Sequence, residues 1–531
     1  MISRRALVTT AAATAALPVA SWHAAAATPK GVLVIVKQID DIVSFDPAQS
    51  FEFTNGEINA NCYHRLVRPD ASDANKVAPD LATSWDVSKD GLEITFHLQD
   101  KAKFATGKTV TAEDAAFSLQ RAVILNKTPA FIITQLGFNK DNVEKLIRAT
   151  APNTLVLTLP QPWATSFVLY CLSATVGSIV DKATVMARDE KGDLGNAWMQ
   201  TRTAGSGAYQ LTSWQASDRV ICDVNPHSSV DAFNKRVVMR HVPDPSAQML
   251  MLEKQDTDVA RDLTPELLRK ARANKDFTVT SAGLGRVIYI AMNMAVPEFQ
   301  KPAVRQAIKW AIDYDGIASN ITPDTHVVCQ SFLPAGLPGA VPGKPFKRDV
   351  AKAKALLAEA GFPNGFEMTL DHFNQPPYND IAQALQANLK DIGIKVTLLP
   401  GESRQVITKT RARTHQLAML AWGTDYFDPN SNTQAFLANP DNSDASKLKI
   451  LAWRSHFVDA GLTAMVEQAA KELDTDKRMA MYAFMQRTAQ EMAPFAFMLQ
   501  PIASAVMGKG VSGFVVGAVA DFTKYAAVKK A

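Results

Sequence analysis

The sequence predicts an α/β fold, because strand-like and helix-like patterns alternate through both halves of the chain. Short runs of β-branched and aliphatic residues, such as Val32–Val36, indicate buried strands. Longer segments with apolar residues at helical spacing, such as 476–492, indicate amphipathic helices. Hydrophobic residues make up 47% of the 531 residues, which is enough for a large core, and the length favours about three to four domains.

In the first half, residues 85–98 alternate apolar and polar side chains around a turn at 89–91, which predicts a β-hairpin. Residues 154–159 predict another strand, and 57–67 have helical spacing. Thr111 is expected to cap a helix by accepting a hydrogen bond from the Asp114 amide. In the second half we expect helices at 302–312, 350–360, 380–392 and 476–492, and strands at 287–294, 395–399 and 416–422.

The first 27 residues have the organisation of an export signal. Arg4 and Arg5 precede a weakly apolar run at 11–20, and small residues at 24–27 offer a cleavage site. The arginine pair is typical of a twin-arginine signal, with an ordinary secretory signal as the alternative. No later stretch reaches the roughly 18 apolar residues of a membrane span, so we expect an exported, soluble mature chain.

Charge and cysteine usage exclude some functions. The chain has 56 basic and 52 acidic residues, a formal charge of +4, and no basic block that would favour nucleic acid. Its four cysteines, Cys62, Cys171, Cys222 and Cys329, are widely spaced with no C-x-x-C motif, which argues against a metal site. Export permits disulfides, and all three possible pairings stay open.

No catalytic or cofactor motif is complete. Residues 106–109 resemble part of a phosphate loop, but Ala102 stands where a glycine is needed. The G-S-G at 205–207 lacks the spacing of a nucleophile elbow, and no H-E-x-x-H motif occurs. We therefore expect a protein that is not an enzyme and needs no cofactor or metal, although a site assembled from distant residues remains possible.

Several short segments form an ordered set along residues 35–498. They include Phe45–Ala48, Leu66–Asp70, Val77–Trp85, Val110–Asp114, Gly205–Tyr209, Val304–Ile308 and Ala353–Phe362. Together they resemble the peptide/nickel class of solute-binding proteins of ABC importers, which is bacterial extracellular solute-binding protein family 5 and contains the dipeptide- and oligopeptide-binding proteins. Ala208 departs from the proline that is usual in the family's glycine loop.

The resemblance implies a two-lobed periplasmic-binding-protein fold of the type II, cluster C kind, with the ligand held between lobes joined by a hinge. It implies lobe I at 28–290 with an extra subdomain at about 70–203, lobe II at 291–500, and a tail at 501–531 that returns to lobe I. The strand at 287–294 is expected to cross between the lobes. The implied protein is a periplasmic monomer that delivers its ligand to an ABC permease, and indirectly to ATPase subunits, at the inner membrane.

The best candidate for ligand contact is a W-x-x-D-Y segment after the strand at 416–422. In oligopeptide-binding members the aspartate pairs with the α-ammonium group of the ligand, which implies that role for Asp425. A desolvated carboxylate at a strand end would also favour a cation on physical grounds alone. The segment supplies the candidates Trp422, Thr424, Asp425 and Tyr426. Trp422 and Tyr426 could form apolar walls and supply a hydroxyl.

Other candidates are weaker. Gly205, Ser206 and Gly207 could offer backbone amides, and Phe53 and Asn55 could line the cleft. Dipeptide-binding members carry an arginine shortly before a Pro-Tyr pair, but Pro376 stands there, which argues against a dipeptide held at both ends. Cations could instead come from Arg404, Arg411 and Arg413, for which a solvated rim is the alternative.

The sequence leaves the ligand open. The leading hypothesis is a peptide or peptide-like solute, and the first alternative is another solute such as an opine, an oligosaccharide or a metal chelate. An exported hydrolase and an exported chaperone or receptor built on the same lobes are further alternatives.

Overall fold

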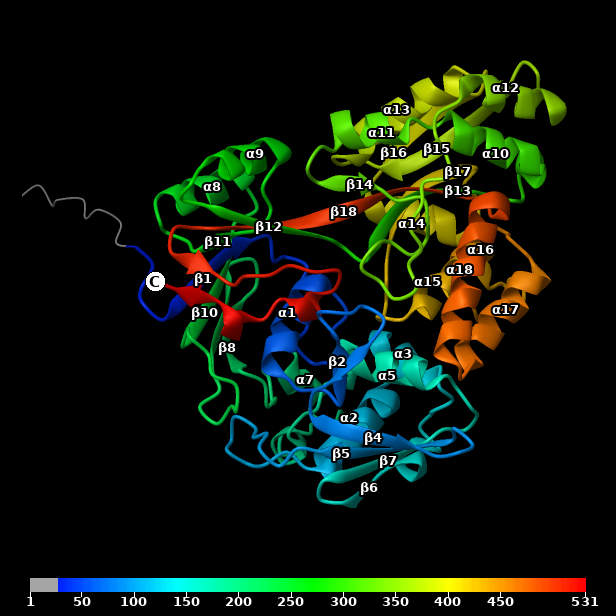
Figure 1. The fold of residues 1–531 in the computed structure, drawn as a ribbon. Helices are drawn as coiled ribbons and strands as arrows, with labels where there is room; N and C mark the ends of the chain where they lie inside the picture. Colours follow the sequence, from blue (N-terminus) through cyan, green and yellow to red (C-terminus); the bar gives the residue numbers. More distant parts are fainter. Residues whose placement is uncertain (1–26) are drawn as a thin grey trace, which may run out of the picture.

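The computed structural model describes residues 27–531, so almost all of the predicted export signal lies outside the described residues. The chain forms two large lobes with a smaller subdomain below them (Figure 1). Within the described residues no helix is long and apolar enough to cross a membrane.

One twelve-stranded sheet runs through both lobes. Its main path is β16 (Lys395–Gly401), β15 (Glu367–Phe373), β17 (Leu417–Gly423), β13 (Arg286–Met292), β18 (Phe495–Met507), β11 (Val259–Ala260), β1 (Val32–Lys37), β10 (Arg236–His241), β9 (Arg219–Val224) and β8 (Tyr209–Gln215). Two further strands, β12 (Thr278–Gly283) and β14 (His326–Val328), pair with β18.

Strand β18 is the long connection between the lobes. Its first half pairs with β13 and β14 in the second lobe, and its second half pairs with β12 and β11 in the first lobe. The other connection is Leu284–Gly285, between β12 and β13. The strand expected at 287–294 is therefore β13, and the chain changes lobe just before it, whereas the predicted boundary after residue 290 falls inside it.

The subdomain has its own four-stranded sheet. The order is β4 (Ala82–Val87), β5 (Glu93–Leu98), β7 (Thr154–Thr158) and β6 (Ile147–Ala151), and α2 (Ala112–Leu125) packs on it. This confirms the predicted hairpin and the strand at 154–159. Thr111 caps α2 as predicted, since its hydroxyl accepts a hydrogen bond from the Asp114 amide at 3.3 Å.

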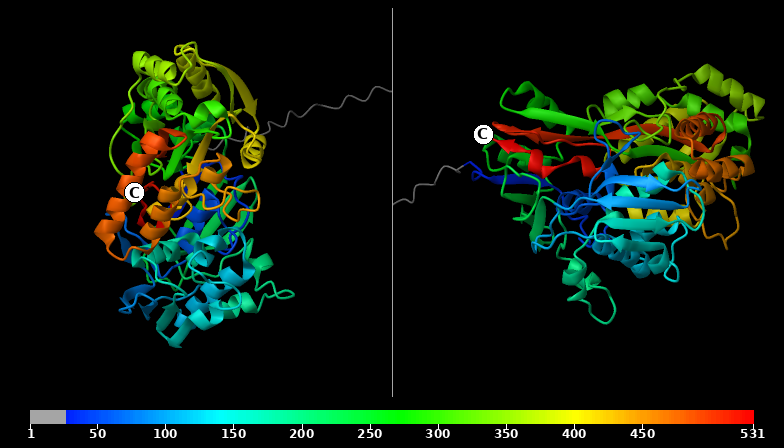
Figure 2. Two further views of the ribbon diagram at one scale, coloured as in Figure 1. Left: turned by 90° about the vertical axis from the view of Figure 1, so that its right-hand side faces the viewer. Right: turned by 60° about the horizontal axis from the view of Figure 1, so that its bottom comes forward.

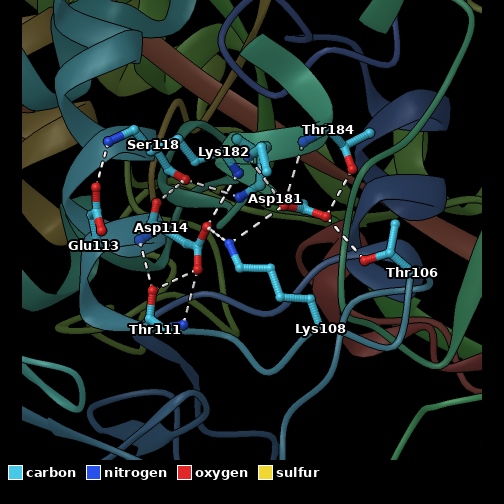
Figure 3. A network of polar contacts seen from close by, with 11 residues as sticks. Thr106, Lys108, Thr111, Glu113, Asp114, Ser118, Asp181, Lys182 and Thr184 are labelled. Carbon is cyan, nitrogen blue, oxygen red and sulfur yellow. Dashed lines mark hydrogen bonds and ion pairs between the residues drawn. The ribbon is translucent and has the colours of Figure 1, made fainter. Parts of the chain in front are cut away.

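The segment that resembled a phosphate loop is a turn with a structural role (Figure 3). The ammonium group of Lys108 lies 2.8 Å from Asp114 and 3.6 Å from Asp181. Asp181 also accepts a hydrogen bond from Thr106 and caps α6 (Lys182–Met186). The lysine therefore holds two buried carboxylates at two helix starts, which ties α2 to α6.

The first helix differs from the prediction. Helix α1 spans Phe53–Cys62, whereas the spacing predicted a helix at 57–67. Leu66 and Val67 lie beyond its end, and Val67 begins β2 (Val67–Pro69), which pairs with β3 (Val77–Pro79). The prediction was wrong beyond Cys62, because Leu66 and Val67 are buried but lie just before and at the start of a short hairpin.

The second lobe carries helices beside its half of the large sheet. Helices α10 (Pro302–Ala311), α12 (Val350–Glu359) and α13 (Tyr378–Lys390) match three predicted helices within two residues at each end. Helices α15 (Pro429–Leu437), α17 (Ala460–Lys471) and α18 (Thr475–Met492) reach down toward the subdomain (Figure 1). The other helices of eight or more described residues are α5 (Thr165–Ser173), α8 (Pro245–Glu253), α9 (Pro265–Ala273) and α14 (Ser403–Arg411).

After β18 the chain returns to the first lobe, where the C-terminus lies (Figure 2). Strand β19 (Val511–Ser512) pairs with β20 (Lys529–Lys530). The Lys530 ammonium group donates to the Val32 carbonyl at 3.0 Å and lies 3.1 Å from Asp258. Before it docks there, the tail passes the space between the lobes, and residues 519–521 line that space.

Candidate functional site

A cavity of about 350 Å³ lies between the two lobes and the subdomain. The second lobe contributes the end of β17 and the loop that follows it. The opposite wall comes from the start of α1, the subdomain and the C-terminal tail. The lining includes Phe51, Glu52, Phe53, Gly56, Ile132, residues 173–176, Arg286, residues 421–427 and residues 519–521.

Hydrogen bonds on both sides hold the loop that carries Asp425. The Thr424 amide donates to the Gly285 carbonyl at 2.8 Å, and the Asp425 amide donates to the Ser431 hydroxyl at 3.0 Å. Asp428 then caps α15 through the Asn430 amide. The backbone of the loop is thus fixed while the Asp425 side chain lines the cavity.

The Asp425 carboxylate is partly buried and unpaired. Among the described residues no donor lies within hydrogen-bonding distance of its oxygens, and no cation forms an ion pair with it. Burial raises the pKa of Asp425 to about 7, and Arg454 opposes this rise only in part. A cation that entered the cavity would relieve the cost of burying this charge.

Aromatic side chains form much of the remaining wall. The Trp422 ring packs edge-on against Phe436 at 6.4 Å, and its indole N–H is buried without a hydrogen-bond partner among the described residues. A ligand acceptor could satisfy this group. The Tyr426 hydroxyl is engaged away from the loop, since it donates to the Gln135 side chain at 3.4 Å.

Arg286 and Phe53 meet at the back of the cavity. Arg286 begins β13, and its guanidinium carbon lies 4.7 Å from the centre of the Phe53 ring. Both residues, together with Val519 and Ala520, also border a second cavity of about 720 Å³ that extends toward β1 and β18. The two cavities therefore adjoin each other between the lobes.

Comparison with known proteins agrees with this two-lobed architecture. The family model described as "Bacterial extracellular solute-binding proteins, family 5 Middle" matches residues 76–444. The chain belongs to this family. The resemblance and the two-lobed α/β fold expected from the sequence are thus confirmed.

Among its relatives is the probable D,D-dipeptide-binding periplasmic protein DdpA of Escherichia coli, 28% identical over 498 residues, which are 92% of each chain. The Helicobacter pylori periplasmic binding protein DppA, solved with the peptide STSA, has a TM-score of 0.76 at 23% identity over 94% of this chain and 98% of that one. AgaA of A. tumefaciens R10, solved with agropinic acid, has a TM-score of 0.73 at 22% identity over 94% and 99%.

Five of the residues predicted to contact a ligand line the cavity between the lobes: Phe53, Trp422, Thr424, Asp425 and Tyr426. Ligand contact by these residues stays a prediction. Asn55, also predicted, is fully buried in α1. Its amide donates to the Ser44 carbonyl and to Glu52, and it lines neither of the two adjoining cavities.

The glycine loop at 205–207 lies outside both cavities. A Cβ atom on Gly205 would stand 2.1 Å from the Cys62 carbonyl oxygen, so this loop packs directly on the end of α1. The Gly207 amide donates to the same carbonyl at 2.9 Å, and Ser206 contacts His64 at 3.0 Å. Ligand contact by Gly205, Ser206 and Gly207 stays a prediction, and the structure gives these residues a packing role.

Sequence reasoning missed several lining residues, and Arg286 is the most important. It begins an apolar strand without any motif around it, so only the pairing of β13 with β17 reveals its position opposite Gly423, at the strand end that leads to Asp425. The tail residues 519–521 lie almost one hundred residues further along the chain than Asp425, and the return of β18 brings them to the site. The three predicted alternatives Arg404, Arg411 and Arg413 line neither cavity.

Within the described residues no group of three or more histidine, cysteine, aspartate or glutamate side chains could hold a metal ion.

Proposed function

We propose that this solute-binding protein captures a short peptide or peptide-like ligand between its lobes, with the α-ammonium group of the ligand paired to Asp425. The observation that carries the proposal is an unpaired carboxylate, partly buried in a cavity between the lobes. Relatives whose names state dipeptide or oligopeptide binding support this ligand class.

The size and polarity of the space fit such a ligand. The cavity of about 350 Å³ is near the lower end of the roughly 300–1,000 Å³ that is usual for small-ligand sites. The aromatic walls can contact a ligand side chain, and the free Trp422 N–H can donate a hydrogen bond to a peptide carbonyl. The adjoining cavity of about 720 Å³ leaves room for a ligand longer than a dipeptide.

The proposal includes the route and the partners of the protein. Periplasmic relatives support a periplasmic location, reached by a twin-arginine signal that is cleaved near residue 27. There the protein would act as a monomer without catalysing a reaction, and pass its ligand to an ABC permease whose ATPase subunits supply the energy. Closure of the lobes would present the loaded surface to the permease.

Calorimetric titration with a pooled library of di- and tripeptides tests the proposal. The tightest binder is then compared in its free and N-acetylated forms, against the natural protein and Asp425→Asn. We expect acetylation and the substitution each to weaken binding at least about tenfold, with little further loss when they are combined, because both remove one ion pair. Asp141→Asn, an exposed aspartate of the subdomain, is the matched control.

If no library member binds, while an opine, an oligosaccharide or a metal chelate does, the peptide assignment is wrong. If the acetylated and free peptides bind equally, the ligand is not held by its amine at Asp425.

A further inference from the structure

Arg286 is an arginine without a carboxylate partner at the junction of the two cavities. Its side chain is partly buried and makes no hydrogen bond or ion pair with any described residue. By contrast, Arg121 pairs with Asp46, Arg261 with Glu57 and Arg478 with Asp428, and the buried Arg305 donates to the backbone carbonyls of Phe299 and Met492. An unpaired guanidinium in such a place is costly unless something else neutralises it.

The backbone explains where this side chain lies. Arg286 is paired with Gly423 across β13 and β17, two residues before Asp425. A Cβ atom on Gly423 would stand 3.8 Å from the Arg286 Nε and 3.4 Å from the Phe53 ring. The absence of a side chain at Gly423 thus leaves the guanidinium beside the strand end, with one face against Phe53.

Acids near the larger cavity do not neutralise Arg286. Glu57 is occupied by Arg261 at 3.1 Å, and Asp41 accepts a hydrogen bond from the Thr54 amide at 3.2 Å. Desolvation lowers the pKa of Arg286 from its ordinary value, and the Tyr378 side chain opposes this effect only in part. The N–H groups of the guanidinium therefore remain available to a ligand that lies between the lobes.

We propose that Arg286 binds the carboxylate of the same ligand whose ammonium group binds Asp425, so that the site selects a zwitterion held at both ends. The inference rests on the proposed function and deepens it. The planar fork of a guanidinium matches a carboxylate in two parallel hydrogen bonds, which gives orientation as well as affinity. Arg286 and Asp425 form no ion pair with each other, so each is free to take one end of the ligand.

Amidation of the ligand tests this assignment. The tightest peptide from the library is prepared with a free and with an amidated C-terminus, and both are titrated against the natural protein and Arg286→Gln. We expect amidation to weaken binding to the natural protein at least about tenfold. Arg286→Gln should bind the free peptide as weakly as the natural protein binds the amide, and amidation should cost it almost nothing more.

Two control variants separate binding from structure. Arg404→Gln removes an exposed arginine that lines neither cavity, and should keep the full amidation penalty. Arg148→Gln removes an exposed arginine of the subdomain that also lines neither cavity, and should keep the penalty as well.

An equal amidation penalty in Arg286→Gln and the natural protein, or no penalty in either, would overturn the role of Arg286. That outcome leaves the Asp425 assignment standing, because N-acetylation tests it separately. Failure of every peptide to bind would overturn both.

Discussion

The Asp425 carboxylate can pair with a cationic ligand group, but its partly buried position disfavours the charged form. Its backbone is fixed by Gly285 and Ser431, while its carboxylate faces a cavity with no protein donor in reach among the described residues. Without a ligand, the Asp425 carboxyl group keeps its proton up to near neutral pH. It releases the proton when a cation binds beside it.

Binding should therefore depend on pH in a predictable direction. Since burial raises the pKa of Asp425 to about 7, the carboxyl is protonated below that pH and the affinity for an ammonium group should fall, by up to about tenfold per pH unit. Above about pH 8 the α-amine of the peptide loses its own proton. Titration calorimetry from pH 5 to 9 should give the tightest binding between about 7 and 8.

Asp425→Asn should lose the acidic limb of this profile. An unchanged affinity of the natural protein between pH 5 and 7 would contradict the role of the Asp425 carboxylate.

A second residue-level prediction concerns the buried ion pair below the site. Both terminal guanidinium nitrogens of Arg478 donate to the Asp428 carboxylate, at 2.7 and 2.9 Å, and both side chains are fully buried. Arg478→Met should lower the free energy of unfolding by about 3–5 kcal/mol, because it leaves a buried carboxylate alone. Lys395→Met, in an exposed pair with Glu367, should have no measurable effect. Similar urea midpoints for both variants would contradict this difference.

At this scale the sequence predicted residues with a local motif and missed those without one. Asp425 and Trp422 stand in a recognisable segment after a buried strand, so their place in the cavity follows from the pattern. Pro376 suggested that no arginine would hold the far end of a dipeptide. The structure brings Arg286 from another strand to the neighbourhood of Pro377 and Tyr378, which no spacing in the sequence reveals.

At the scale of elements, the glycine loop at 205–207 shows that one sequence pattern can have two structural interpretations. A glycine-rich turn can expose amides to a ligand, or it can allow two backbones to approach closely. Gly205 has the second role, because the Cys62 carbonyl occupies the place of its missing side chain. The sequence gives no sign of this contact, since the two residues lie far apart along the chain. Strands and helices with clear periodicity, such as β5 and α18, were by contrast predictable within a few residues.

Gly205→Ala should therefore destabilise the protein rather than weaken its ligand contacts. The new methyl group would overlap a carbonyl oxygen, and we expect a loss of about 1–3 kcal/mol in the free energy of unfolding. Gly461→Ala in α17 has its nearest neighbour at 3.4 Å, and should be neutral or slightly stabilising. Normal stability of Gly205→Ala with reduced ligand affinity would instead favour the ligand-contact reading.

The cysteines allow a prediction at the same scale. The end of α1 and strand β9 bring Cys62 and Cys222 into one buried cluster, and the nearby Cys62 side chain, together with burial, raises the pKa of Cys222. Cys171 lies in the subdomain core and Cys329 in the second lobe. Oxidation should therefore join Cys62 to Cys222 and leave Cys171 and Cys329 as free thiols.

Peptide mapping of exported protein without reducing agent measures this linkage. Cys171→Ser should leave it intact, whereas a bridge that includes Cys171 or Cys329, or four free thiols after oxidation, would contradict the prediction.

At the scale of the whole molecule, the large sheet links the candidate ligand-contacting residues to the connections between the lobes. β18 and the Leu284–Gly285 connection join the lobes, and both Asp425 and Arg286 lie within a few residues of that second connection in space. The opposite wall of the cavity comes from the first lobe, the subdomain and the tail. A ligand between these walls would contact both lobes, so its binding energy can favour the closed arrangement.

The central claim is that the space between the lobes holds a short peptide, and native mass spectrometry of the exported protein tests it most directly. Protein purified without refolding is weighed intact, and its bound material is then released by denaturation and identified. Our account predicts short peptides with free amines, retained by the natural protein and lost from Asp425→Asn. A single non-peptide compound, retained equally by both proteins, would contradict it.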